Sequence, residues 1–82
     1  MTPSELLETI ATALYGAQFQ KALADDLGVS DRRVRRWLDG QVDPPNGVWS
    51  DLVCICDYRR NALAEMAKDA HEAAKGAEST LR

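Results

Sequence analysis

The segment from Gln20 to Trp37, with the sequence QKALADDLGVSDRRVRRW, constrains the fold of this chain more than any other segment does. Gly28 can adopt the positive φ that ends a helix sharply. Ser30 can then cap a new helix, because its hydroxyl accepts a hydrogen bond from a free backbone N–H in the first turn, and Asp31 places negative charge at the positive end of that helix. The pattern predicts two helices joined by a tight turn, the second beginning at Asp31.

The second of these helices is predicted to have an apolar face and a basic face. Val34, Trp37 and Leu38 lie three and four residues apart, so they share the face that packs on the preceding helix. Ala24 is small where we expect the two helices to cross, and a large side chain there would push them apart. The other positions carry the arginines Arg32, Arg33, Arg35 and Arg36. We therefore expect a helix-turn-helix whose basic face is directed at DNA.

Counted from Gln20, this segment resembles the twenty-residue helix-turn-helix of the lambda repressor and Cro-like (Xre-type) family. The matching positions, which form the core of the motif, are Gln20 as first, Ala24 as fifth, Gly28 as ninth, Val34 as fifteenth and Trp37 as eighteenth. The LGVS sequence at the turn adds to the resemblance, which covers about residues 3–52. It implies an all-α fold of four to five helices, a lambda-repressor-like DNA-binding domain whose third helix lies in the major groove.

The resemblance also implies which side chains reach base edges. Asp31, Arg32 and Arg36 match positions of the family motif that often do so. A guanidinium can donate two hydrogen bonds to O6 and N7 of guanine, so Arg32 or Arg36 predicts a guanine in the half-site. Asp31 has two interpretations, as an acceptor from a cytosine amino group or as support for the helix start, and we favour support.

Other positions are expected to contact phosphate. Gln20 matches an opening residue of the family motif that usually touches phosphate, and Arg33 and Arg35 are then phosphate contacts as well. The simpler alternative is a solvated face, with ion pairs four residues apart that join Arg35 to Asp31 and to Asp39. Four arginines within five residues exceed what this alternative explains.

The length and charge of the chain limit the number of domains and the kind of DNA binding it can support. The chain has 82 residues, enough for one small domain, and its 45% hydrophobic content with five Gly and three Pro favours compact helices. The formal net charge of −3 argues against strong non-specific affinity for DNA. Residues 1–29 carry one lysine against four acidic residues, whereas residues 30–40 carry four arginines against two aspartates. The positive charge is therefore concentrated on the predicted second helix of the motif.

The N-terminal part is predicted to supply most of the core. A first helix from Pro3 to about Leu14 has Thr2 as its N-cap and Glu5 as the second half of a capping box. Its apolar positions, all expected in the core, are Leu6, Leu7, Ile10, Ala11 and Leu14. A helix over about 17–27 follows, with its core face formed by Phe19, Leu23 and Leu27.

After a loop over residues 41–47, a last helix is expected from about Val48. Its core face is predicted to consist of Val48, Trp49, Leu52, Val53, Ile55 and Cys56. No helix breaker follows before Gly76, and nearly thirty helical residues span about 40 Å, more than so small a domain can cover. A second copy of the chain is the simplest partner that could cover the rest of this helix. The possible dimer interface consists of Arg59, Leu63, Met66 and Ala70. A mostly solvated helix held by ion pairs is the alternative.

The predicted organisation has three parts. Residues 1–56 form the DNA-binding domain, with the helix-turn-helix at 20–39. Residues 57–77 extend the last helix and are a possible dimerisation element, and residues 78–82 are a frayed tail.

Few signals favour catalysis or metal binding. Cys54 and Cys56 point to different sides of one predicted helix, so we expect two free thiols that serve helix packing rather than a disulfide or a metal site. His71 is isolated on a polar stretch, and no Ser or Cys has a plausible His and acid beside it, so we expect no enzyme, no cofactor and no metal. No leader or membrane-spanning pattern is present, which predicts a cytoplasmic protein without a membrane partner.

These observations predict a sequence-specific transcription regulator that binds double-stranded DNA. We expect a homodimeric repressor that reads an inverted-repeat operator in the major groove. So short a chain leaves no room for an ordinary effector pocket, so no small-molecule effector is expected. The alternative from another class is a protein-interaction module, such as an adaptor, an inhibitor or an antitoxin, that uses the same helices to bind a protein.

Overall fold

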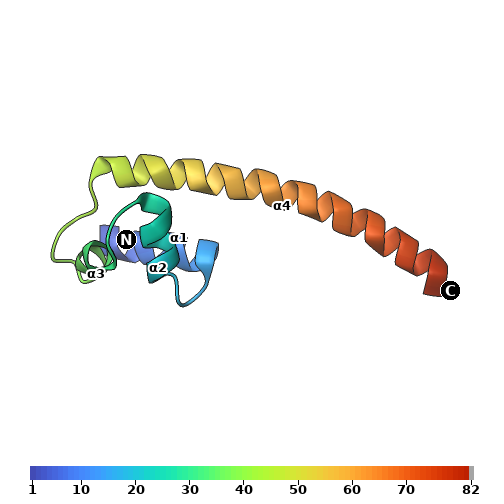
Figure 1. The fold of residues 1–82 in the computed structure, drawn as a ribbon, viewed down its shortest axis with the longest axis horizontal. Coiled ribbons are helices and arrows are strands. Elements are labelled where there is room, and N and C mark those ends of the chain that lie inside the picture. The colour runs from blue at the N-terminus through green and yellow to red at the C-terminus, as the bar shows by residue number, and fades with distance from the viewer. Residues whose placement is uncertain (82) are drawn as a thin grey trace.

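The computed structural model describes the backbone of residues 1–81 and the side chains of residues 1–76. Within this part the chain is all-α, as predicted, and consists of α1 (Pro3–Tyr15), α2 (Gln20–Leu27), α3 (Asp31–Leu38) and α4 (Asn46–Leu81). Helices α1 to α3 gather beneath the N-terminal part of α4, which continues beyond them (Figure 1). The molecule measures 58 × 24 × 21 Å. The predicted frayed tail at 78–82 lies outside the fully described residues.

Side chains cap two of the helices at their N-termini, as the sequence predicts. The Thr2 hydroxyl accepts a hydrogen bond from the Glu5 backbone N–H at 3.2 Å, and it donates to the Glu5 carboxylate at 3.0 Å. The Glu5 side chain thus pairs with the Thr2 hydroxyl, whereas a capping box would pair it with the Thr2 backbone. The Ser30 hydroxyl accepts from the Arg33 N–H at 3.2 Å and starts α3 at Asp31.

The turn between α2 and α3 depends on Gly28. Its φ of 69° and ψ of 32° lie in the left-handed region, where a side chain is disfavoured. The next residue, Val29, donates its N–H to the Ala24 carbonyl at 3.0 Å, which is the hydrogen bond of a Schellman motif. Gly40 ends α3 in the same way with a φ of 77°. The C-terminal ends of both helices in the pair are therefore defined by local sequence.

Two helix boundaries differ from the predicted ones. α2 begins at Gln20 instead of about residue 17, because the chain leaves α1 through Gly16, whose φ is 89°, and uses residues 17 and 18 to turn. Phe19 occupies the N-cap position of α2, and its ring is buried. α4 begins at Asn46, two residues before Val48, and its bounds extend past Gly76.

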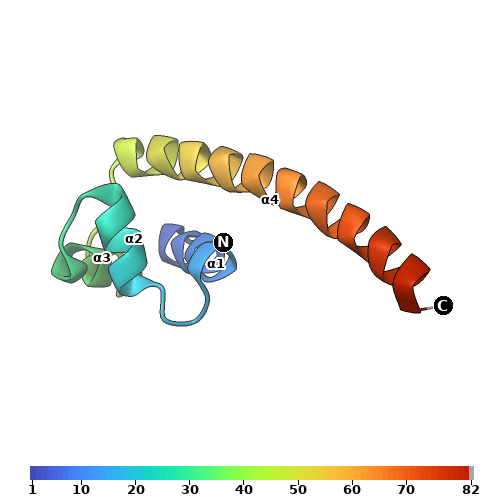
Figure 2. The ribbon, with the colours of Figure 1, turned by 45° about the vertical axis from the view of Figure 1, so that its right-hand side comes forward.

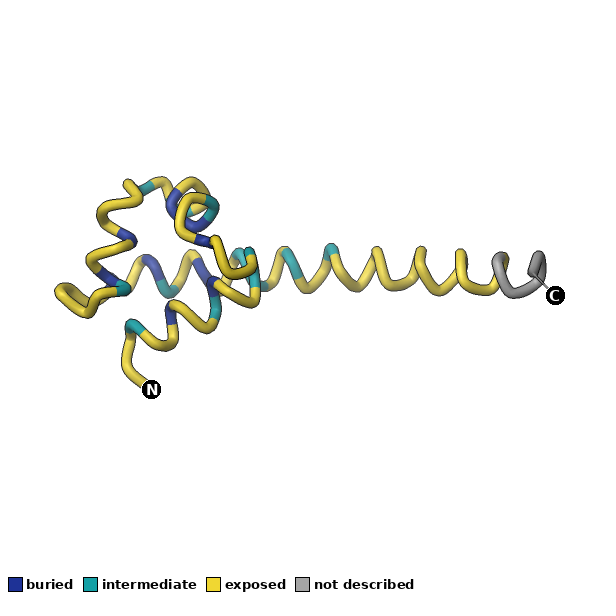
Figure 3. The backbone as a smooth tube through the Cα atoms, turned by 90° about the horizontal axis from the view of Figure 1, so that it is seen from below, coloured by how far each residue is buried: buried dark blue, intermediate teal, exposed yellow. Residues whose placement is uncertain are grey.

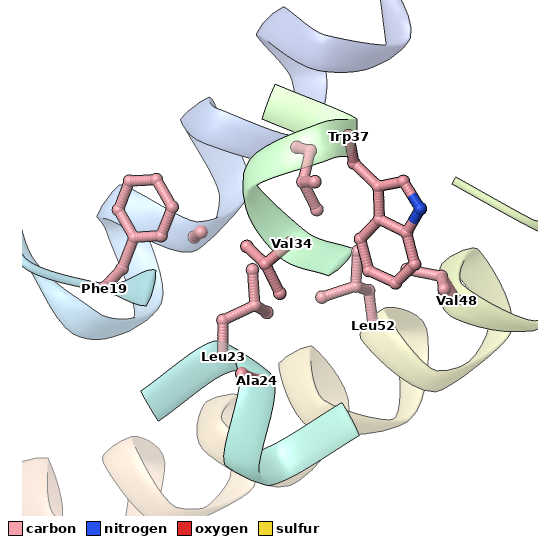
Figure 4. Close-up of a cluster of buried hydrophobic side chains, with 9 residues drawn as sticks. Phe19, Leu23, Ala24, Val34, Trp37, Val48 and Leu52 are labelled. Atoms are coloured by element: carbon pink, nitrogen blue, oxygen red, sulfur yellow. The ribbon is translucent and has the colours of Figure 1, made fainter. Parts of the chain in front are cut away.

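The core combines side chains from all four helices and the α1–α2 connection. Its buried hydrophobic members are Leu7, Ala11, Phe19, Leu23, Ala24, Val34, Trp37, Val48 and Leu52. Figure 4 shows Val34 of α3 pointing toward Leu23 of α2, with the Trp37 indole next to Val48 and Leu52 of α4. Helices that are too short to be stable alone are thus held by shared burial.

Two residues expected in the core are exposed instead. Leu6 is 39% exposed and Val53 is 60% exposed. Each is adjacent in sequence to a fully buried leucine, Leu7 or Leu52, and adjacent helical residues point about 100° apart. The buried face of each helix is therefore narrower than the apolar pattern indicates.

Arg59 fixes α4 to the end of α1. Its guanidinium donates to the Leu14 carbonyl at 3.0 Å and lies 5.3 Å from the centroid of the Tyr15 ring. The last turn of α1 contains no basic residue, so Arg59 supplies the positive charge that a helix C-terminus favours. The Tyr15 hydroxyl in turn donates to Asp26 of α2 at 2.5 Å. Arg59, assigned above to a possible dimer interface, therefore also has a role within one chain.

Beyond Arg59, α4 projects from the domain as an arm, defined here as residues 60–76. All but one of its residues are exposed, as the colours of Figure 3 show, and Leu63 and Met66 are 60% and 61% exposed. α4 curves gently toward the side on which α1 to α3 lie (Figure 2). None of the helices in the described part of the chain has the length and hydropathy that a membrane span requires.

Candidate nucleic-acid interface

Helix α3 presents its basic face outward because its apolar face is fully used. Val34 and Trp37 are buried against the other helices, and Ala24 is buried where α2 meets α3. The four arginines between and around them, Arg32, Arg33, Arg35 and Arg36, are all exposed. Sequence spacing alone thus produces a helix with one side in the core and four cations in solvent.

The direction of α3 is fixed at both ends. Ser30 caps its N-terminus, and at its C-terminus the Ser4 hydroxyl of α1 donates to the Trp37 carbonyl at 2.9 Å. Gly40 lies next to the same hydroxyl, and a Cβ atom there would be in ordinary van der Waals contact with Ser4 Oγ, at 3.5 Å. The contact joins residues 33 positions apart, so the sequence alone did not reveal it. It joins the C-terminal end of the basic helix to α1.

The arginines of α3 have no counterion in the described part of the chain. The ion pair found there joins Arg60 and Asp57 on α4, at 3.6 Å. The pairs of Arg35 with Asp31 and with Asp39, which the solvated-face alternative requires, do not form. Neither do the four guanidinium groups make side-chain hydrogen bonds within that part. They are free to bind an anion from outside.

Arg32 and Arg36 occupy the centre of the basic face. Both line a shallow hollow with Arg35 and Asp39, and both line a second one with Arg33 next to the turn. Because they lie four residues apart, they project side by side one turn apart along α3. Two of the three residues that match base-contacting positions are therefore together, with two of the three expected phosphate contacts beside them.

Gln20 and Asp31 lie together near the start of α2, in a hollow separate from the two that Arg32 and Arg36 line. They line a hollow that also includes Lys21, at the start of α2. No side chain caps this helix start, since Phe19 occupies the N-cap position. Lys21 is a cation that the sequence analysis did not assign, although its position directly after Gln20 in the motif was a signal for it. Asp31 is exposed in the first turn of α3, where its charge favours the helix.

Two kinds of side chain outside α3 could carry other chemistry, metal ligands and reactive thiols. In the described part of the chain no group of three or more His, Cys, Asp or Glu residues is placed to hold a metal. Cys54 and Cys56 are free thiols, as predicted, but Cys54 is exposed and Cys56 is half-buried. The expectation that both serve packing is therefore wrong for Cys54, which lies on the side of α4 away from the core.

Comparison of the chain with protein-family models, with curated proteins and with solved structures gave no match. Within its described part, the molecule is an all-α chain that presents four unpaired arginines on a short helix after a tight turn.

Proposed function

We propose that this chain is a transcription regulator that binds double-stranded DNA sequence-specifically, with α3 in the major groove. The observation that carries the proposal is the set of four exposed arginines on one face of α3 without a counterion in the described residues. The buried Val34 and Trp37 keep that face in one direction. An α-helix is about 10–12 Å wide with its side chains, and the major groove of B-DNA is about 12 Å wide.

The positions of the side chains support separate roles. Arg32 and Arg36, central on the face, donate to guanine edges, while Arg33 and Arg35 beside them contact phosphates. Gln20 and Lys21 bind a further phosphate at the uncapped start of α2, where free backbone N–H groups add to the attraction. Asp31 supports the first turn of α3 and does not contact the DNA.

The acidic remainder of the chain contributes to specificity. The whole chain has a formal net charge of −3, so it has little general attraction for phosphate, and its positive charge is concentrated on α3. Affinity then depends on correctly docked contacts rather than on a general attraction. A homodimeric repressor that reads an inverted repeat fits this design, because two half-sites together supply the affinity that one small interface lacks.

The experiment compares variants on duplexes enriched from random DNA. Changing Arg32→Ala and Arg36→Ala together removes two guanine contacts, each worth about 1–3 kcal/mol, so affinity for the enriched duplex should fall at least about 30-fold. Lys68→Ala removes a charge from the arm and serves as the control, with a change of less than about threefold. Equal losses for both variants would contradict the proposal.

A second pair of measurements separates base contacts from phosphate contacts. Arg35→Ala should weaken binding to all duplexes alike and reduce the slope of log K against log salt by about one. The double variant of Arg32 and Arg36 should instead reduce discrimination between the enriched and a scrambled duplex. If Arg35→Ala altered discrimination and the double variant did not, the assigned roles would be wrong.

A further inference from the structure

Exposed apolar side chains gather at two places that the DNA-binding face does not use. One is the arm, where Leu63 and Met66 are more than half exposed. The other is a hollow between α1 and α4, called here the α1–α4 hollow, where Val53 is 60% exposed. This hollow is lined by Ile10, Trp49, Leu52, Val53, Cys56 and Asp57. Neither surface is covered by the described part of the chain.

The two surfaces belong to one continuous face of α4. Positions that recur every seven residues lie on nearly the same side of a helix. Such a series along α4 is Leu52, Arg59, Met66 and Ala73. Its first member is buried in the core and its second contacts α1, whereas Met66 and Ala73 are exposed. The face that packs on the domain therefore continues, uncovered, along the arm.

We propose that a second copy of this chain covers both surfaces, with the two α4 helices antiparallel and each arm lying along the α1–α4 hollow of the partner. The proposal specifies the geometry of the homodimer named under the proposed function. The same patch is used twice, so the interface is isologous, as two-fold symmetry requires.

The antiparallel direction follows from what already lies against α4. α1 lies beneath the N-terminal half of α4 (Figure 1), and Arg59 of α4 donates to the Leu14 carbonyl near the C-terminal end of α1. A parallel partner in register would bring its own α1 to α3 to the same level, where the two domains would collide. An antiparallel partner places the domains at opposite ends and brings each arm to the other's hollow.

The side chains complement each other in this register. A two-fold axis that crosses α4 between Arg59 and Arg60 sets Leu63 against the partner's Cys56 and Met66 against the partner's Val53. It also sets the small Ala70 against the bulky indole of the partner's Trp49. Large arm residues thus meet the open hollow, and a small one meets the bulky ring.

Charges do not oppose this arrangement. The arm carries three basic residues, Arg60, Lys68 and Lys75, and three acidic residues, Glu65, Asp69 and Glu72. Close to the axis, Arg60 is paired with Asp57 at 3.6 Å and the Arg59 guanidinium is turned toward α1. The register also sets Arg59 beside the partner's Arg60, and the contacts just given draw both guanidinium groups toward their own chains. Each arm, whose charges sum to zero, lies against residues 43–59 of the partner and meets no net repulsion there. α3 lies at the end of the molecule away from the arm, so its arginines stay exposed (Figure 1).

Disulfide trapping in the full chain, without DNA, tests the geometry. In a Cys54→Ser background that keeps the native Cys56, Leu63→Cys should give a covalent dimer on mild oxidation. A bond within one chain is excluded, because seven helical residues separate the two positions by about 10 Å, beyond the reach of a disulfide. Lys68→Cys, on the polar side of the arm, is the matched control and should stay monomeric under the same conditions.

A parallel dimer would behave differently. With Cys54→Ser and Cys56→Ser combined, Leu63→Cys alone pairs with its own symmetry mate only if the helices are parallel. Efficient trapping of that variant would overturn the proposal, and so would failure to trap the first variant.

Sedimentation equilibrium tests the assembly independently of any thiol. The unmodified chain should dimerise, and Leu63→Asp should raise the dimer Kd at least about tenfold because it places a charge in the apolar interface. Lys68→Asp, which introduces the same side chain outside the interface with a larger change of charge, should leave the Kd within about threefold. A chain that stays monomeric up to millimolar concentration would overturn the proposal. Loss of sequence-specific DNA binding with the dimer intact would contradict only the proposed function.

Discussion

At the scale of single residues, Arg59 connects three helices. It donates to the end of α1, lies over the Tyr15 ring, and through Tyr15 is linked to Asp26 of α2. The sequence placed Arg59 at a helical spacing that continued the apolar face of α4, and spacing alone cannot show a contact between residues 45 positions apart. Only the packing of α4 on α1 reveals it.

Removing this arginine should weaken the domain. Arg59→Ala loses a charged hydrogen bond and a cation–π contact, and we expect the free energy of unfolding to fall by about 1–3 kcal/mol in urea titrations. Arg60→Ala, which removes an exposed arginine paired at 3.6 Å, is the control and should cost less than about 1 kcal/mol. Equal costs would show that the contact of Arg59 with α1 contributes little.

We expect the free energy of unfolding to depend on the ionisation of Tyr15 at alkaline pH. Burial raises the pKa of Tyr15 above its ordinary value near 10, and its hydrogen bond to Asp26 raises it further. The folded state therefore favours the neutral phenol. Its contribution to stability is complete below the unfolded pKa near 10 and is lost as pH rises from there toward the folded pKa.

The prediction is a steeper loss of stability above pH 10 in the unmodified chain than in Tyr15→Phe, measured by urea unfolding at several pH values. Tyr58→Phe removes an exposed tyrosine and should leave the steep loss in place. A profile that Tyr15→Phe does not flatten would contradict this account.

At the scale of elements, the tight-turn pair was predictable because its signals are local. Ser30 and Gly28 act on backbone groups within a few residues, and the structure has the predicted cap and left-handed turn. The start of α2 was not predictable in the same way, since it depends on how Phe19 reaches the core. For the candidate site, exposure of the arginines followed from spacing, whereas the Ser4 contact that fixes α3 is tertiary.

Ala24 tests whether the crossing of α2 and α3 sets the direction of the basic face. The residue is buried at that crossing, so Ala24→Leu should overpack it and lower the free energy of unfolding by about 1–3 kcal/mol. DNA affinity should fall in addition, in protein that remains folded. Ala64→Leu on the exposed arm is the control and should change neither quantity appreciably. Normal stability and affinity in Ala24→Leu would show that the crossing tolerates bulk.

At the scale of the whole molecule, the basic face of α3 and the exposed apolar side chains of the arm lie at opposite ends (Figure 1). α3 carries four arginines that have no counterion among the described residues, on an otherwise acidic chain, and the arm carries apolar side chains that its own domain leaves uncovered. Sequence alone predicted both features, the arm from its unbroken helical pattern. It could not predict that α1 occupies the same face of α4, which is what makes an antiparallel partner fit.

The central claim is that α3 reads DNA sequence, and selection of random duplex DNA on the purified chain at near-physiological salt tests it most directly. Sedimentation of the selected complex then gives the number of chains bound. The account predicts an enriched inverted repeat with guanines in each half-site, bound by two chains. No enrichment, together with binding that disappears as salt rises, would contradict it and favour a protein-interaction module.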